Sequence, residues 1–414
     1  MTRTTLFIAA SVVLAACARP PADAPPVEDS VLAGQYRATL QLPGGELPFG
    51  FELVRLGDRN LIYLQNGAER LAVEDVTLAG DTLEARMPGY ENRISAKAEG
   101  AALRGELLLV KRGGANQVIP FIAERGVTHR FFATPAASAG SVSGRWAVTF
   151  AEADGKTSPG VAEFRQEGAA VTGTILTPTG DHRYLAGEMR GNELYLSTFD
   201  GAHAYLYRAQ LAADDTLAGT FWSGLAWEQA FSARRDEAAT LEGAPATAVR
   251  NAAERLEFTF PDLDGQPVSL SDPRFADKVV VITLAGSWCP NCHDEAMFLA
   301  PWYQRNRARG LEVISLMFEH FGDFEAAAAA TRLFRADLGI QYTTLIAGVS
   351  DRDDVAKKLP QLDAIYAFPT TLFLDRSGRV RHVHTGFSGP ATGAHYDALT
   401  AQFDALLEQL LAEG

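Results

Sequence analysis

A short apolar run followed at once by two cysteines is the feature that most constrains the fold of this chain. Residues 279–285 read Val-Val-Val-Ile-Thr-Leu-Ala, which predicts a strand buried on both faces, as in the middle of an α/β sheet. Gly286 and Ser287 interrupt the run, and Pro290 suits the first turn of a helix, where its missing N–H costs nothing. The pattern therefore predicts a strand-to-helix junction with Cys289 at the helix N-terminus.

The position of the two cysteines indicates redox chemistry. Unpaired N–H groups and the helix dipole stabilise a thiolate at a helix N-terminus and lower the cysteine pKa below its free value of about 8.5. We therefore expect Cys289 to be the nucleophile. Cys292 lies one turn deeper and is expected to resolve a mixed disulfide.

Two other uses of the cysteine pair are weighed against redox cycling. An inert structural disulfide is common in exported proteins, but closing so short a loop removes little entropy from the unfolded chain. A zinc site needs four ligands, and the sequence has no second cysteine pair. Redox cycling is the favoured interpretation, and no metal is expected at this site.

Two further segments carry a resemblance to a known family. The first segment reads Phe-Pro-Asp-Leu-Asp-Gly-Gln at 260–266, followed by Val-Ser-Leu at 268–270. The second reads Phe-Pro-Thr-Thr-Leu-Phe-Leu-Asp at 368–375, followed by Ser-Gly-Arg-Val at 377–380. With the dithiol, they make the region from 258 to 411 similar to the thioredoxin-like proteins of the TlpA and ResA type, which are membrane-tethered disulfide reductases of the bacterial envelope. The resemblance implies an α/β thioredoxin-like domain and a reductase that uses no cofactor, with a disulfide-containing protein as substrate and an upstream thiol as electron donor.

The resemblance also implies roles for single residues. Pro369 is expected to be cis and to face the dithiol, which an X-Pro bond allows at a cost of only about 0.5 to 1 kcal/mol. Phe368 would then offer its backbone to an extended substrate chain. Substrate contacts are expected from Trp288, Pro290, Phe368 and Thr370.

A proton carrier is expected beneath the dithiol. Many thioredoxins carry an aspartate six residues before the first cysteine, where this chain has Thr283. Glu295 matches a glutamate of the TlpA and ResA group, and on a helix it returns toward the Cys292 face. A partly desolvated carboxylate there would have a raised pKa and could take the proton that Cys292 loses. Its alternative role is to complement the helix dipole.

The first residues resemble a bacterial lipoprotein signal. An arginine at position 3 precedes an apolar core and Leu-Ala-Ala-Cys at 14–17, which predicts a signal peptide over 1–16 and lipidation of Cys17. A transmembrane anchor is the rival interpretation, but the apolar stretch is shorter than about 18 residues. Ala18 favours the outer over the inner membrane, with the protein facing the periplasm.

Composition limits the partners. The chain has 414 residues with 47% hydrophobic and 21% charged side chains, enough for two or three globular domains. Its net charge of −14 disfavours nucleic acid as a partner and leaves lipid at Cys17 as the expected membrane attachment.

The region before the dithiol domain predicts two tandem antiparallel β modules. Short alternating runs are separated by Gly, Asp and Asn turns, and several motifs recur at offsets of 110 to 114 residues: Gly34 as Gly144, Gly50 as Gly160, Gly80 as Gly191, and Leu103-Arg104-Gly105 as Leu217-Ala218-Gly219. The predicted organisation is a lipidated tether over 17–31, β modules over 32–134 and 141–236, a linker over 237–253, and a thioredoxin-like domain over 254–414.

Other side chains of note receive mostly structural interpretations. Isolated histidines at 182 and 203 are expected at the surface, and Glu319 and His320 in a solvated loop, although α/β sites tend to lie at that end of a strand. Aromatic residues of the β modules could line a ligand cup or a protein-binding face, but they are more often core. They are Tyr90, Trp146, Tyr195, Tyr205, Tyr207, Trp222 and Trp227.

Alternative functions stay open. The direction of electron flow could be that of a disulfide oxidase or isomerase. His293, His382 and His384 suggest a copper chaperone similar to the Sco proteins, although those have three residues between their cysteines. A ligand-binding lipoprotein without catalysis is the third alternative.

Overall fold

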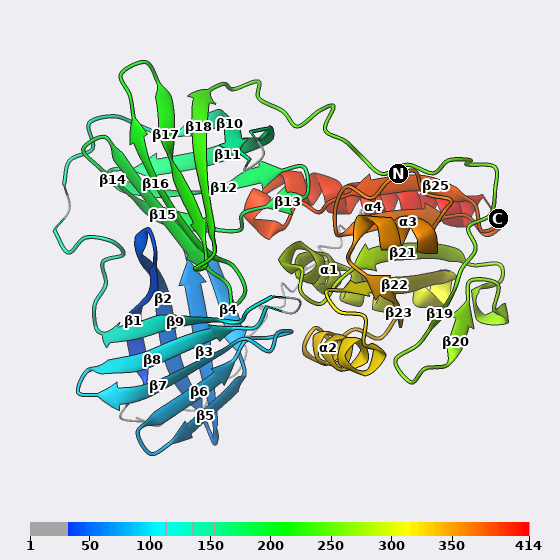
Figure 1. Cartoon of the computed structure of the whole chain (residues 1–414), viewed down its shortest axis with the longest axis horizontal. Coiled ribbons are helices and arrows are strands. Elements are labelled where there is room, and N and C mark those ends of the chain that lie inside the picture. Colours follow the sequence, from blue (N-terminus) through cyan, green and yellow to red (C-terminus); the bar gives the residue numbers. More distant parts are fainter. Residues whose placement is uncertain (1–31, 112–113, 135, 153–154, 414) are drawn as a thin grey trace, which may run out of the picture.

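The chain forms two β modules and a separate α/β domain, which lie side by side in Figure 1. The structure is a computed structural model, and it describes residues 32–111, 114–134, 136–152 and 155–413. The predicted signal peptide, the tether and Cys17 lie outside the described residues.

The first module is one antiparallel sheet in which nearly every strand pairs with its neighbour in sequence. The order is β4-β3-β2-β1-β9-β8-β7-β6-β5. Its strands are β1 (Gly34–Leu42), β2 (Gly45–Leu56), β3 (Arg59–Asn66), β4 (Glu69–Val73), β5 (Asp75–Ala79), β6 (Thr82–Arg86), β7 (Arg93–Glu99), β8 (Ala102–Leu109) and β9 (Gln117–Arg125).

The second module has the same up-and-down plan and closes into a barrel, because β11 pairs with both β10 and β12. The order is β11-β10-β18-β17-β16-β15-β14-β12-β13. Its strands are β10 (Gly144–Ala151), β11 (Thr157–Glu167), β12 (Ala170–Thr177), β13 (Gly180–Asp181), β14 (Leu185–Arg190), β15 (Glu193–Phe199), β16 (Ala204–Leu211), β17 (Thr216–Ser223) and β18 (Trp227–Arg235).

The repeated glycines occupy equivalent places in the two sheets. Gly105 lies on β8 and Gly219 on β17, each in the strand before the last of its module. A Cβ atom on Gly105 would lie 1.9 Å from the carbonyl oxygen of Ser95, and one on Gly219 2.0 Å from that of Arg208. A close approach of neighbouring strands therefore explains why both modules need glycine there.

The two β modules pack directly on each other. Phe199 of β15 belongs to the core of the first module, with its ring 4.9 Å from that of Phe49. The Asn66 amide donates to the Phe199 carbonyl at 2.9 Å, and the Ser197 hydroxyl to the Pro48 carbonyl at 2.6 Å. The modules thus form one body joined by buried contacts.

The C-terminal domain contains a five-stranded mixed sheet in the order β23-β22-β21-β24-β25. The central strand β21 is parallel to β22 and antiparallel to β24, and all its residues are buried. The elements are β19 (Thr259–Pro261), β20 (Pro267–Ser269), β21 (Val279–Ala285), α1 (Pro290–Asn306), β22 (Leu311–Glu319), α2 (Phe324–Asp337), β23 (Thr343–Val349), α3 (Arg352–Lys358), β24 (Thr370–Leu374), β25 (Val380–Thr385) and α4 (Ala394–Ala412). Short 3₁₀ helices span Pro273–Phe275, Arg307–Arg309 and Pro390–Thr392.

Both faces of this sheet are covered, as the continuous apolar run of β21 predicts. One core packs side chains of α1, α2 and α4 against the sheet, and the other packs α3 and residues 256–275 against the opposite face. Among the described residues, no helix is both long and apolar enough to cross a membrane.

The chain joins the α/β domain before residue 254. The Thr247 N–H donates to the Thr385 hydroxyl at 2.9 Å, and the Arg250 N–H to the Gln361 carbonyl at 2.8 Å. Val249 forms a bridge with Leu362. The last part of the segment predicted as a linker is therefore held on the α/β domain.

Candidate active site

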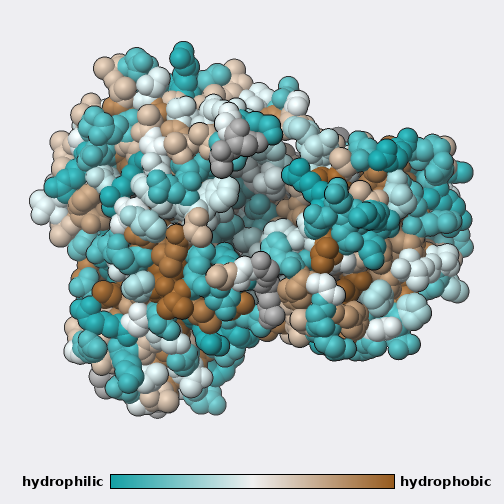
Figure 2. Space-filling view, viewed as in Figure 1, coloured by the Kyte–Doolittle hydropathy of each residue, from teal (hydrophilic) through white to brown (hydrophobic). Residues whose placement is uncertain are grey.

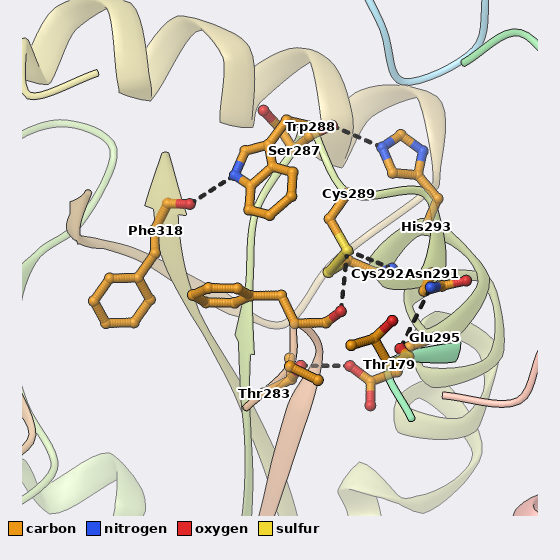
Figure 3. The surroundings of a disulfide bond; sticks show 12 residues. Thr179, Thr283, Ser287, Trp288, Cys289, Asn291, Cys292, His293, Glu295 and Phe318 are labelled. Carbon is orange, nitrogen blue, oxygen red and sulfur yellow. Dashed lines mark hydrogen bonds between the residues drawn. A yellow bond between two sulfur atoms is a disulfide. The ribbon is translucent and has the colours of Figure 1, made fainter. Parts of the chain in front are cut away.

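The two cysteines lie where β21 passes into α1 and form a disulfide, with their Cα atoms 5.2 Å apart. Cys289 is the N-cap residue of α1, and Pro290 occupies the first turn. The Cys289 Sγ atom accepts the Cys292 N–H at 3.2 Å. Figure 3 shows this arrangement. The sulfur atom of Cys289 is thus held by a backbone donor at the helix N-terminus, an arrangement that favours a thiolate when the bond is reduced.

The end of β22 holds the loop before Cys289. The Glu319 carboxylate accepts both the N–H and the hydroxyl of Ser287 at 2.9 Å, and the indole of Trp288 donates to the Phe318 carbonyl at 2.9 Å. A Cβ atom on Gly286 would lie 2.8 Å from that same carbonyl oxygen, so glycine is needed at this close approach.

This contact corrects the interpretation of Glu319 as a solvated loop residue, because Glu319 is only 1% exposed. A carboxylate at the end of a strand is solvated in most proteins, whereas the Glu319 carboxylate accepts two hydrogen bonds from Ser287. His320 is exposed but stacks on Trp288 with ring centroids 4.0 Å apart. Both residues therefore belong to the surroundings of the dithiol.

The proline loop faces the dithiol. The Phe368–Pro369 peptide bond is cis, and the Phe368 carbonyl oxygen lies 3.4 Å from the Cys289 Sγ atom. The Phe368 ring packs edge-on against Trp288 at 5.7 Å. Thr370 is fully buried, and its hydroxyl donates to the Ala367 carbonyl at 2.7 Å. Its side chain therefore stabilises the proline loop.

Glu295 lies buried below the dithiol, next to the central strands (Figure 3). Its carboxylate accepts hydrogen bonds from the hydroxyls of Thr283 and Thr371. Burial raises the pKa of Glu295 to about 7, against the opposing effect of the two hydroxyls. A group with such a pKa can both accept and release a proton near neutral pH.

The first turn of α1 also contacts both β modules, which the sequence did not predict. The His293 ring stacks on Tyr90 of the first module at 3.9 Å with 6° between the planes, and its Nε2 atom lies 2.9 Å from the Ser287 carbonyl oxygen. The Asn291 amide donates to the Thr179 carbonyl of the second module at 3.4 Å. Burial lowers the pKa of His293 to about 4, so this ring stacks as a neutral group.

A buried ion cluster joins all three parts of the protein at the same helix. Arg183 of the second module pairs with Glu69 of the first module, with Asp200 at 3.1 Å, and with Asp294 of α1. The four side chains are 8% exposed or less. Burial raises the pKa of Asp294 to about 6, although Arg183 opposes the shift. Asp294, which lies between His293 and Glu295 in the sequence, is thus tied to the β modules.

Further contacts support the same docking. Asp337, the last residue of α2, pairs with Arg86 at 2.6 Å and accepts the Gly89 N–H at 2.8 Å. The Gly389 N–H donates to Asp181 at 2.6 Å. The β modules therefore hold the α/β domain on the side that carries the dithiol.

The interpretation of His182 and His203 as surface residues is wrong. His203 is 9% exposed, and its Nδ1 atom lies 2.9 Å from Asp200. His182 contacts the Tyr207 hydroxyl and stacks on Phe221 inside the second module. Among the residues that the structure describes, no group of three or more His, Cys, Asp or Glu side chains is arranged to hold a metal ion.

The aromatic residues of the β modules divide between core and pocket. Trp146 and Tyr207 are buried in the core of the second module, as expected for most of the set, and Trp227 is 50% exposed. Tyr90 and Tyr205 instead line a cavity beside the dithiol loop.

The mixed sheet, the helix that starts at the dithiol and the proline loop opposite it define a thioredoxin-like domain with a redox-capable cysteine pair. Residues 243–399 match the family described as Redoxin. The redoxin domain of this chain is therefore similar to the relatives named ResA, as the sequence motifs indicate.

Several relatives are thiol-disulfide oxidoreductases named ResA. The one from Bacillus thuringiensis (strain Al Hakam) is 24% identical over 127 residues, which cover 31% of this chain and 65% of the relative. The relative from Geobacillus kaustophilus (strain HTA426) is 26% identical, over 34% of this chain and 72% of the relative. The relative from Bacillus subtilis (strain 168) is 22% identical, over 33% of this chain and 69% of the relative. The chain thus spans just under two thirds of the length of the Bacillus thuringiensis relative.

Solved structures of similar proteins cover a slightly larger share of the chain. A thioredoxin-family thiol:disulfide interchange protein from Chlorobium tepidum TLS is 19% identical, with a TM-score of 0.30, and covers 38% of this chain and 94% of that chain. A DsbF homologue from Corynebacterium diphtheriae is 22% identical, with a TM-score of 0.30, and covers 40% of this chain and 97% of that chain.

Proposed function

We propose that this protein is a thiol-disulfide oxidoreductase that reduces disulfides in other proteins. The observation that carries the proposal is the Cys289–Cys292 disulfide at the N-terminus of α1, opposite Phe368–Pro369 and above Glu295. An inert structural bridge would not require a buried carboxylate with a pKa of about 7 next to it.

In the reduced protein, the Cys289 thiolate attacks one sulfur of the substrate disulfide. A mixed disulfide forms, and the other substrate sulfur leaves as a thiolate that takes up a proton. Cys292 then gives its proton to the Glu295 carboxylate and attacks the Cys289 sulfur, which breaks the mixed disulfide and releases the second substrate sulfur as a thiolate that also takes up a proton. The substrate receives two electrons and becomes a dithiol, while Cys289 and Cys292 become the disulfide, which an upstream thiol donor reduces again.

Substrate contacts are assigned to the rim of the dithiol. Trp288 and Pro290 flank Cys289 and are partly exposed, and the Phe368 backbone lies next to the sulfur. We assign these three residues to substrate binding. Thr370 acts on the substrate only through the proline loop that it stabilises.

Glu295→Gln tests the proton carrier. The variant should slow the release of mixed disulfides and remove the pH dependence of that step near pH 7, because glutamine keeps the shape but cannot take the proton. Rapid-quench measurement of mixed-disulfide decay across pH checks this expectation. An unchanged pH profile would reduce Glu295 to a helix-dipole role.

The same variant has a second expected effect, on stability. The folded protein binds the Glu295 proton more tightly than the unfolded chain, so ionisation of Glu295 destabilises the fold as pH rises from about 4.5 toward the folded pKa of about 7. Above that pH, Glu295→Gln should raise the free energy of unfolding by roughly 3 kcal/mol, and below about pH 4.5 the gain should vanish. Urea unfolding of both proteins at the two pH extremes measures the difference.

We also infer that the protein works in the bacterial envelope, attached by lipid at Cys17 and facing the periplasm, with the outer membrane favoured. The lipoprotein-like motif at 14–17 supports this location. Cys17→Ala should release the protein from the membrane fraction, and the mass of the wild-type N-terminal peptide should include the acyl groups. A wild-type N-terminus without lipid would contradict the assignment.

A further inference from the structure

The β modules lie against the side of the redoxin domain that carries the dithiol. In Figure 2 the surface is hollowed between the β modules and the redoxin domain, and Cys289 is only 4% exposed. A cavity of about 570 Å³ lies there, lined by residues of all three parts of the protein. Trp288 and Pro290, the residues on either side of Cys289, are among the lining residues, so a molecule in the cavity lies beside the residues that flank the dithiol.

The chemistry of the lining is aromatic and polar. Tyr90 of the first module, Tyr205 of the second and Trp288 line the cavity, and all three side chains are partly exposed. Ser223 of β17 lies at the same wall. Rings of this kind contact extended peptides through large, rigid surfaces.

The charge of the lining differs from that of the whole protein. The chain carries a net charge of −14, yet the cavity is lined by Lys111 and by no Asp or Glu side chain among the described residues. Lys111 is exposed and follows β8 at the mouth of the cavity. His203, another lining residue, is engaged with Asp200. Burial lowers the pKa of Lys111 from its usual value, and in its charged form this lining side chain favours an anionic group nearby.

We propose that this cavity binds the polypeptide segment next to the substrate cysteine, and that it selects an extended chain with an acidic side chain. The proposal rests on the dithiol function proposed above. An extended segment can reach Cys289 while pairing with the Phe368 backbone, whereas a rigid folded domain fits poorly against a cysteine that is only 4% exposed. The β modules thus determine which disulfides are reduced.

The test compares three kinds of disulfide with the reduced full-length protein. They are a small uncharged disulfide such as hydroxyethyl disulfide, a pair of short peptide disulfides that differ only in Glu or Lys beside the cysteine, and a disulfide at the surface of a folded domain. We expect the Glu peptide to react about fivefold faster than the Lys peptide, the gain of one exposed ion pair, and the folded domain to react most slowly.

Two variants locate the effect. Lys111→Glu should abolish or reverse the preference between the peptides, while Lys97→Glu, an equal charge change on an exposed residue of β7, should keep it. Ser223→Trp fills the cavity and should slow both peptides by about tenfold or more, with a smaller effect on hydroxyethyl disulfide. Ser232→Trp, on the exposed side of β18, controls for the added bulk.

The outcomes separate the two proposals. If the wild type does not reduce hydroxyethyl disulfide, the proposed function fails. If it reduces that compound but treats the two peptides alike, or reduces the folded domain as fast as the peptides, the function stands and the cavity proposal is overturned. An unchanged peptide rate in a folded Ser223→Trp protein would also overturn it.

Discussion

Cys289→Ser reduces disulfide exchange to the rate of the uncatalysed reaction, whereas Cys292→Ser still attacks the substrate and accumulates the mixed disulfide. The difference follows from the geometry of the helix N-terminus. The Cys289 sulfur accepts the Cys292 N–H and lies beside the Phe368 carbonyl at the substrate side, while Cys292 is 1% exposed within α1. Without Cys292, no second thiolate releases the substrate.

Mass spectrometry of the products measures this expectation, because the trapped species has the combined mass of protein and substrate. The two serine variants are matched controls for each other, since each removes one sulfur. Faster alkylation of Cys292 than of Cys289 in the reduced wild type at mildly acidic pH would reverse the assignment. So would a trapped adduct on the Cys289→Ser protein.

Arg183→Leu destabilises the protein by about 3–5 kcal/mol, the effect expected when one partner of a buried ion cluster is removed. The substitution leaves Glu69, Asp200 and Asp294 buried without their cation. Because Asp294 belongs to the helix that carries the dithiol, the loss should also loosen the contact between the β modules and the redoxin domain.

Urea unfolding followed by tryptophan fluorescence tests this effect. Arg165→Leu is the matched control, because Arg165 lies on the same module and pairs with Glu167 while 78% exposed. Its loss should cost less than about 1 kcal/mol. An Arg183→Leu protein as stable as this control would show that the cluster does not hold the three parts together.

The parts of the site that are local in sequence could be predicted. The buried strand β21, the helix start at Pro290 and the proline loop each follow from a few neighbouring residues, because apolar runs, helix caps and proline act over short distances. The glycines that recur at Gly105 and Gly219 likewise mark equivalent close approaches in the two modules.

The contacts between domains could not be predicted in this way. Tyr90 and Arg183 are more than a hundred residues from the dithiol in sequence, yet they contact His293 and Asp294. No local pattern distinguishes such an arginine from a solvated one, because its burial depends on how separately folded modules pack. His203 is a further case, because its local sequence predicts a surface position and its burial depends on the same packing.

Disulfide reduction by this protein requires that Cys289 and Cys292 form a couple that opens and closes in the folded protein. Equilibration against glutathione buffers of graded potential, followed by alkylation and mass measurement, tests this directly. We predict one reversible two-electron transition, in which the dithiol-to-disulfide ratio changes tenfold for each step of about 30 mV, with the fold retained on both sides. A bond that resists excess reductant until the protein unfolds would instead be a structural bridge, and the proposed chemistry would be wrong.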